Sequence, residues 1–131
     1  MPGVIAVHGN GLVVTELAAV AWIAGSRVLY WGDLDSHGLA ILGELRAVLP
    51  QTESVLMNTE VLQRFAHLAV ADPTPRRGAI GHLTPGETRA LEWLREGDLR
   101  LEQERIPWPY AAAAISQAMG VGQDSSGSRV R

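Results

Sequence analysis

The chain has 131 residues, of which 47% are hydrophobic and 19% are charged. This composition fits one folded domain and excludes a disordered or collagen-like chain. There is no cysteine, which excludes a disulfide scaffold and a thiolate metal site. The net charge of −3 disfavours a protein that holds nucleic acid by positive charge alone. The sequence shows neither a long apolar run nor a basic stretch at its start, so we expect a cytoplasmic chain without a membrane span.

The beginning of the chain alternates between strand and helix patterns. Residues 4–7 are apolar and partly β-branched, which predicts a strand, and the glycine-rich residues 8–11 predict a turn after it. Residues 12–24 are nearly all apolar and long enough for a buried helix. Residues 27–31 predict a second strand, buried on both faces because polar and apolar side chains do not alternate in it.

The same alternation continues through the middle of the chain. Apolar side chains at helical spacing predict a helix over residues 39–49. Residues 54–57 predict a third short strand. A further helix is predicted to extend to Leu68, with either Asn58 or Thr59 as its cap.

The second half begins with a loop and a well-marked helix. Prolines, arginines and glycines in residues 72–81 predict the loop. Thr84 is followed by a proline and, three residues later, by Glu87, which is the spacing of a capping box. We therefore predict a helix from this point to Glu96.

The end of the chain is more polar. Residues 100–106 are dense in charge and predict a connector, and residues 108–119 predict a final helix. Residues 120–131 are rich in glycine and serine, so we expect a flexible tail that follows a domain of residues 1–119.

This order of strands and helices predicts an α/β fold with a mostly parallel sheet and flanking helices. In such sheets the chemistry lies at the carboxyl ends of the strands. The turns at residues 8–11 and 32–38 both occupy that edge. We therefore expect the functional site between these two turns.

Asp33 and Asp35 stand two residues apart at the end of the second predicted strand. Residues two apart on an extended chain point the same way, so both carboxylates can reach one divalent cation. Oxygen ligands alone favour Mg²⁺ or Mn²⁺ over zinc. The structural alternative is that Asp33 is a turn residue and that Asp35 or Ser36 caps the next helix.

Other residues that we expect near this pair could contact a phosphate or have a purely structural role. Gly38 permits a tight entry to the helix, whose N-terminus can help to hold a phosphate. His37 either contacts a phosphate or faces solvent. Gly9 and Gly11 resemble part of a phosphate-binding loop, but they lack its third glycine and its lysine, and a tight turn that lets helix and strand pack closely explains them better. The charged block at 100–106 is either a solvated connector or a segment that folds back over this edge.

Several of these segments resemble the C-terminal domain of the Wadjet anti-plasmid nuclease subunit JetD. The resemblance covers roughly residues 4–118. It lies in the following segments, in the same order as in that family: Tyr-Trp-Gly-Asp-Leu-Asp-Ser-His-Gly at residues 30–38, Leu45-Arg46, Ser-Val-Leu-Met at residues 54–57, Leu83-Thr84 with Glu87, and Arg-Leu-Glu-Gln-Glu-Arg-Ile at residues 100–106.

The resemblance implies a Toprim-like (Rossmann-like) domain similar to the one in topoisomerase VI. In that family an Asp-x-Asp pair and an upstream glutamate hold Mg²⁺ for DNA strand cleavage beside an SMC-like complex. Carried over, it makes Asp33 and Asp35 the ligands of Mg²⁺ or Mn²⁺ and catalytic residues together with Glu104. Residues near the site that contact phosphate or DNA are then Gly9, Gly11, His37, Gly38 and Arg105, with Glu102 beside them.

The resemblance also has a departure. The strand that carries the upstream glutamate has no counterpart here, and Glu16, in an apolar helical stretch, is the only acidic residue before Asp33. We therefore expect a partial domain lacking its first strand, a fragment with weak or no cleavage alone. The alternatives are a non-catalytic binding or assembly module and a small phosphate-binding domain. An exposed sheet edge would favour a homodimer.

Overall fold

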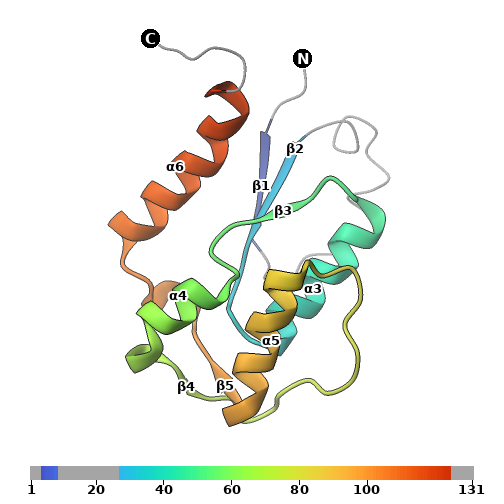
Figure 1. Cartoon of the computed structure of the whole chain (residues 1–131), viewed down its shortest axis with the longest axis vertical. Coiled ribbons are helices and arrows are strands. Elements are labelled where there is room, and N and C mark those ends of the chain that lie inside the picture. The colour runs from blue at the N-terminus through green and yellow to red at the C-terminus, as the bar shows by residue number, and fades with distance from the viewer. Residues whose placement is uncertain (1–3, 9–26, 125–131) are drawn as a thin grey trace.

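The computed structural model describes residues 4–8 and 27–124 (Figure 1). Within them the chain forms a parallel sheet of three strands, an antiparallel pair of strands, four α-helices and two short 3₁₀ helices. The strands are β1 (Val4–His8), β2 (Arg27–Trp31), β3 (Glu53–Ser54), β4 (Val70–Ala71) and β5 (Leu99–Arg100). The helices are α3 (Ser36–Val48), α4 (Thr59–Arg64), η1 (Ala66–Leu68), α5 (Pro85–Gly97), η2 (Gln103–Arg105) and α6 (Trp108–Asp124).

The parallel sheet has the order β1-β2-β3, so β2 lies in its centre. Strand β1 pairs with β2 along its full length, and the last pair places His8 opposite Trp31. Strand β3 pairs with the other side of β2, where Tyr30 lies opposite Ser54. The predicted parallel α/β arrangement is therefore confirmed for the described residues, whereas the helix predicted over residues 12–24 lies outside them.

Strand β3 is shorter than the sequence predicts. It ends at Ser54, although the backbone N–H of Val55 still donates to the carbonyl of Tyr30 over 2.8 Å. The next residue, Leu56, has a φ of +66°. This left-handed conformation breaks the extended backbone that a strand requires, so the apolar run at residues 54–57 continues into the core as a turn.

Helix α3 begins at Ser36, three residues before the predicted start. Asp35 is its N-cap, and its side chain accepts a hydrogen bond from the backbone N–H of Gly38. Capping at this position leaves Gly38 free to enter the first helical turn. The helix buries Leu39 and Leu42 against the sheet side of the core.

The core is built mainly from aliphatic side chains. Helix α5 packs on both α3 and α4, and Figure 1 shows α5 beside α3, with α6 along the other side of the molecule. The largest fully buried side chains come from several elements: Tyr30, Leu34, Leu39, Leu42, Leu45, Leu49, Met57, Leu62, Leu94 and Leu101.

Two helix ends differ from the predicted ones. Helix α4 ends at Arg64, because Phe65 has a non-helical backbone and packs edge-on against Tyr110, with ring centroids 5.0 Å apart. Helix α6 continues past residue 119 to Asp124. The Arg27 guanidinium donates to carbonyls of residues 118 and 119, which fixes this part of α6 beside β2. Residues 125–131 lie outside the described part.

Helix α5 confirms the predicted capping box. Thr84 accepts a hydrogen bond from the backbone of Glu87, whose side chain accepts one in return from the backbone of Thr84. Asn58 is the cap of α4, which settles the choice between the two predicted residues. None of the described helices is long and apolar enough to cross a membrane.

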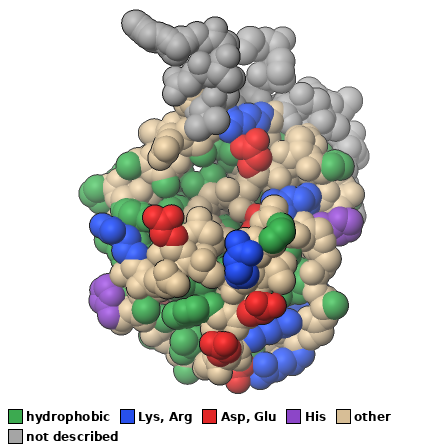
Figure 2. Space-filling view, viewed as in Figure 1, with side chains coloured by type: hydrophobic (Ala, Val, Ile, Leu, Met, Phe, Trp, Pro, Cys, Tyr) green, Lys and Arg blue, Asp and Glu red, His purple; other side chains and the backbone are tan. Residues whose placement is uncertain are grey.

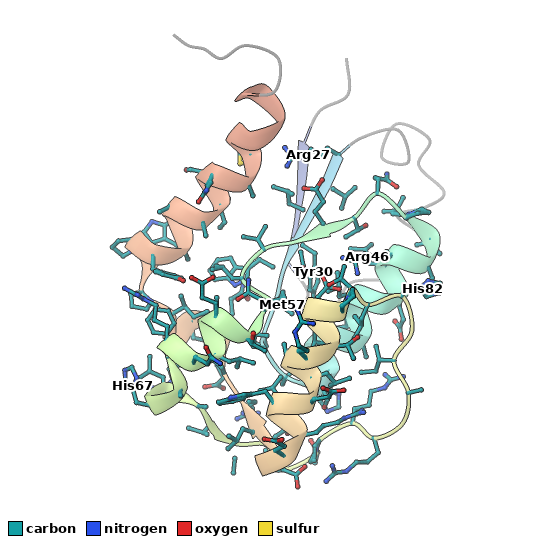
Figure 3. The ribbon with its side chains drawn as sticks, viewed as in Figure 1. Arg27, Tyr30, Arg46, Met57, His67 and His82 are labelled. Carbon is teal, nitrogen blue, oxygen red and sulfur yellow. The ribbon has the colours of Figure 1, made fainter. Side chains whose placement is uncertain are left out.

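An ion pair joins α3 to α5. The Arg46 guanidinium lies 2.6 Å from Oε1 of Glu87, and both side chains are largely buried. Arg46 also donates to the carbonyls of Thr52 and His82, and Figure 3 shows Arg46 and His82 close together near the start of α5. Ser54 donates to the second oxygen of Glu87. This network ties α3, β3 and α5 into one unit.

Candidate functional site

The site is centred on the turn that follows the central strand, β2. Asp33 and Asp35 flank Leu34, which forms an isolated antiparallel bridge with Leu101. The two backbone hydrogen bonds of this bridge are 3.0 and 2.9 Å long. A short pairing of this kind restricts the backbone between the two aspartates, so their carboxylates are carried on a fixed turn.

Asp33 is partly exposed and is held by the segment at residues 100–106. Its Oδ1 accepts a hydrogen bond of 2.7 Å from the backbone N–H of Gln103. The side-chain amide of Gln103 donates in turn to the carbonyl of Trp31, over 3.3 Å. The backbone of the charged segment therefore folds back over the end of β2, while the side chains of Glu104 and Arg105 stay exposed to solvent.

Asp35 is 8% exposed and has the role of a helix cap. Its Oδ1 accepts a hydrogen bond of 2.7 Å from the backbone N–H of Gly38. Burial raises the pKa of Asp35, the charges of Asp33 and Asp72 raise it further, and the bond from Gly38 opposes the shift. The structural alternative is thus confirmed for Asp35.

The donor set fits a hard cation only in part. Each of the two aspartates uses one oxygen for a backbone N–H, and within the described ranges neither forms an ion pair with arginine. Among the described residues no group of three or more histidine, aspartate or glutamate side chains is arranged to hold a metal ion. Mg²⁺ commonly takes one or two carboxylates and completes its shell with water and phosphate oxygens. The Oδ2 atoms of Asp33 and Asp35 would meet that lower requirement.

Gly38 lies against the turn of residues 33–35, which we call the aspartate turn, and there is no room for a side chain at its position. A Cβ at this position would lie 2.0 Å from the carbonyl oxygen of Asp33. The hydroxyl of Tyr30 donates to the carbonyl of Gly38 over 3.0 Å. Burial, together with the charges of Asp35 and Asp33, raises the pKa of Tyr30 and keeps this donor protonated. Gly38 therefore permits the tight entry to the helix that the sequence predicts, and its contact with phosphate stays a prediction.

His37 is exposed and contacts a loop. Its Nε2 lies 2.6 Å from the carbonyl of Thr74, which makes Nε2 the donor because a carbonyl only accepts. Next to it, Ser36 accepts a hydrogen bond of 2.7 Å from the backbone of Arg76. The loop after β4 is thus fastened over the first turn of α3, and the contact of His37 with phosphate stays a prediction.

Asp72 is a neighbour of the site that sequence reasoning missed. It is 7% exposed; its Oδ1 accepts a hydrogen bond from the backbone of Thr74, and its Oδ2 is buried without a partner among the described residues. Its charge contributes to the raised pKa of Asp35. The only signal in the sequence is an aspartate directly before a proline, which is typical of any turn.

The remaining predicted site residues are distributed unevenly. Glu104 is exposed and lines the same pocket as Asp33. Arg105 is also exposed and lies 3.5 Å from a carboxylate oxygen of Glu102. Gly9 and Gly11 lie outside the described residues, as does Glu16. Glu104 and Asp33 therefore line one pocket, whereas Arg105 is paired with a neighbouring carboxylate.

The surface around these elements carries mixed charge. Acidic and basic side chains are interspersed on the face shown in Figure 2. His67 and His82, which show no ligand spacing in the sequence, lie well apart in Figure 3. This face is therefore not a uniformly basic surface.

A match to a protein-family model shows the family to which the chain belongs. The model described as "Wadjet protein JetD, C-terminal" matches residues 1–115. The chain belongs to this family. The predicted resemblance to JetD is therefore confirmed, and the JetD C-terminal domain belongs to the Wadjet defence system. No curated protein matches the chain.

Both aspartates, Gly38 and the charged segment lie within the residues that the JetD family model matches. The match covers most of the chain, so it does not distinguish these residues from the rest of the domain. The structure brings these three features to one edge of the sheet.

Proposed function

We propose that this JetD domain has a Toprim-like fold and carries a site for the metal-dependent cleavage of DNA strands. Asp33 and Asp35 would hold Mg²⁺ or Mn²⁺ at the end of β2. The observation that carries the proposal is that both carboxylates are oriented through their Oδ1 atoms, each by one backbone N–H, so that the two Oδ2 atoms would be the ligands. A cap alone explains Asp35, but it does not explain why Asp33 is fixed beside it.

The cation, when bound, would supply positive charge to the scissile phosphate and to the oxygen that leaves it. Asp33 and Asp35 would hold that charge in place on a rigid turn. Glu104 is the candidate for proton transfer, because it is exposed and lines the pocket of Asp33. It would take a proton from a water whose oxygen bonds to phosphorus, while the bond to the leaving ester oxygen breaks and that oxygen takes a proton from solvent water.

The other predicted contacts are arranged around this centre. Gly38 would let the helix start approach a phosphate oxygen, and His37 and Arg105 would contact the DNA backbone after leaving their present partners. Gly9 and Gly11 would form the neighbouring turn. Of these contacts, that of Gly38 needs the least rearrangement.

Replacing Asp33 with asparagine tests the proposal. We expect Asp33→Asn to weaken Mn²⁺ binding by at least about tenfold, because a neutral amide replaces one anionic ligand. Nicking of supercoiled plasmid in Mn²⁺ should fall by on the order of 100-fold. Calorimetric titration and a plasmid-nicking assay measure the two effects, and Glu44→Gln, which removes one exposed charge from α3, is the matched control.

A non-catalytic module is the second candidate, and the complete capping role of Asp35 favours it. In that case the domain would bind or assemble with partners and keep the cation at most as a structural element. Mn²⁺ binding that depends on Asp33, without nicking, would support the module. Equal Mn²⁺ affinity of wild type, Asp33→Asn and Glu44→Gln would exclude a cation at Asp33, whether catalytic or structural.

The partners we propose are DNA and the SMC-like subunits of the Wadjet complex, together with a second copy of the chain. In the described part of the chain β1 has a strand partner on one side only, and an edge of this kind pairs readily with another copy. We expect size-exclusion chromatography with light scattering to give the mass of a dimer. A monomer across the concentration range would contradict this.

A further inference from the structure

A pocket next to Asp33 has two tryptophans on its wall. It has a volume of about 580 Å³ and lies where the end of β2, the helix η2 and the start of α6 meet. Trp31 and Trp108 stack there, with ring centroids 6.5 Å apart and planes inclined by 30°. The wall also includes Asp33, Gln103 and Glu104. A pocket of this size is large enough for a small organic ligand.

Trp108 is unusually exposed for its type. It is 65% accessible, although a tryptophan normally buries most of its large apolar surface. The backbone around it is stiff, because Pro107 and Pro109 flank it and the carbonyl of Pro107 accepts hydrogen bonds from Tyr110 and Ala111. The indole is thus held at a rigid helix start, so a ligand that stacks on it causes little additional loss of backbone conformational entropy.

The polar groups of the pocket select the kind of ligand. The carboxylates of Asp33 and Glu104, which line the pocket, repel a phosphate group but leave the face of a neutral aromatic ring unaffected. The exposed indole of Trp108 offers a flat surface on which such a ring can stack. An uncharged planar ring therefore suits this pocket better than an anion.

We infer that this pocket binds an unpaired nucleobase of DNA, stacked on Trp108. The inference deepens the proposed function and rests on it, because the base would belong to the strand whose phosphate lies at Asp33. Stacking of bases on aromatic side chains does not require a particular sequence. Stacking would hold single-stranded DNA, or a locally opened strand of a duplex, at the aspartate turn. This matters in a protein with a net charge of −3, which does not attract DNA by its overall charge.

The test compares the wild type with Trp108→Ala and Trp108→Phe. Anisotropy of a fluorescent single-stranded oligodeoxynucleotide measures binding in metal-free buffer, so that no strand is cut, at physiological salt, which screens the carboxylates from the phosphates. We expect Trp108→Ala to weaken binding by roughly 5- to 100-fold, the range for loss of one stacked base. Trp108→Phe should keep most of the affinity, and a duplex of the same sequence should bind less tightly than the single strand.

Met119→Ala is the matched control, because Met119 is an exposed apolar residue of the same helix. Circular dichroism checks that each variant is folded. The inference is overturned if the wild type does not bind the single strand, if Trp108→Ala binds as tightly as wild type, or if Trp108→Phe loses as much as Trp108→Ala. A change in oligomeric state without a change in DNA affinity would assign Trp108 to a protein interface and also overturn it.

The nicking assay separates this inference from the proposed function. If the wild type nicks plasmid in Mn²⁺ while Trp108→Ala binds the single strand normally, the base pocket is wrong and the nuclease proposal stands. If binding depends on Trp108, no protein nicks plasmid and Mn²⁺ affinity does not depend on Asp33, the base pocket stands and the nuclease proposal is wrong.

Discussion

Replacing Glu87 with glutamine is expected to destabilise the folded chain by about 3 kcal/mol, the low end of the range for breaking a buried ion pair from one side. Glu87 and Arg46 are 4% and 14% exposed in their side chains, and the substitution would leave the guanidinium buried with only carbonyl partners. Chemical denaturation, followed by circular dichroism at pH 7, measures the change in the free energy of unfolding.

Glu53→Gln is the matched control for this variant. Glu53 also pairs with an arginine, Arg27, at 2.9 Å, but its side chain is 52% exposed. Exposed pairs of this kind contribute at most about 1 kcal/mol. Equal losses of stability in Glu87→Gln and Glu53→Gln would contradict the structural role of the buried pair.

The effect of Glu87→Gln should also depend on pH. Burial alone would raise the pKa of Glu87, but hydrogen bonds from Arg46, Ser54 and the backbone of Thr84 outweigh it and hold this pKa below the ordinary value of 4.5. The unfolded chain then binds the proton more readily than the folded one, so the contribution of the carboxylate is complete above pH 4.5 and is lost as the pH falls through the lowered pKa. The difference in stability between wild type and Glu87→Gln should therefore narrow in acid.

The Gly38→Ala variant is expected to lose about 2 kcal/mol of stability. The new Cβ would overlap the carbonyl oxygen of Asp33, which belongs to the backbone and cannot rotate away. Relief requires the aspartate turn to move, so Mn²⁺ affinity should fall as well if the turn holds the cation. Thermal unfolding and calorimetric titration measure the two losses.

Gly86→Ala is the control for the same chemical change. It lies in the first turn of α5, where the nearest atoms to an added Cβ are 3.8 and 3.9 Å away in side chains. Alanine is the better helix former, so this variant should be as stable as wild type or more stable by up to about 1 kcal/mol. If Gly38→Ala behaves like Gly86→Ala, the close contact at the aspartate turn has no energetic importance.

Elements with local signals could be predicted from the amino-acid order. The uninterrupted apolar run predicted β2, and the proline, Thr84 and Glu87 predicted the start of α5. The same holds for the location of the candidate site, since carboxyl ends of parallel strands share an edge. These predictions depend on residues that are at most a few positions apart.

The contacts that bring distant segments together around the site could be learned only from the folded chain. The contact between Gln103 and Asp33 spans 70 residues, and the burial of Asp72 and the stacking of Trp31 on Trp108 depend on segments brought together only by folding. Even Glu87 has a second role, in the pair with Arg46, that its capping signal does not reveal. Contacts of this kind leave no periodic pattern in the chain, because their partners are selected by packing in three dimensions and not by spacing along the sequence.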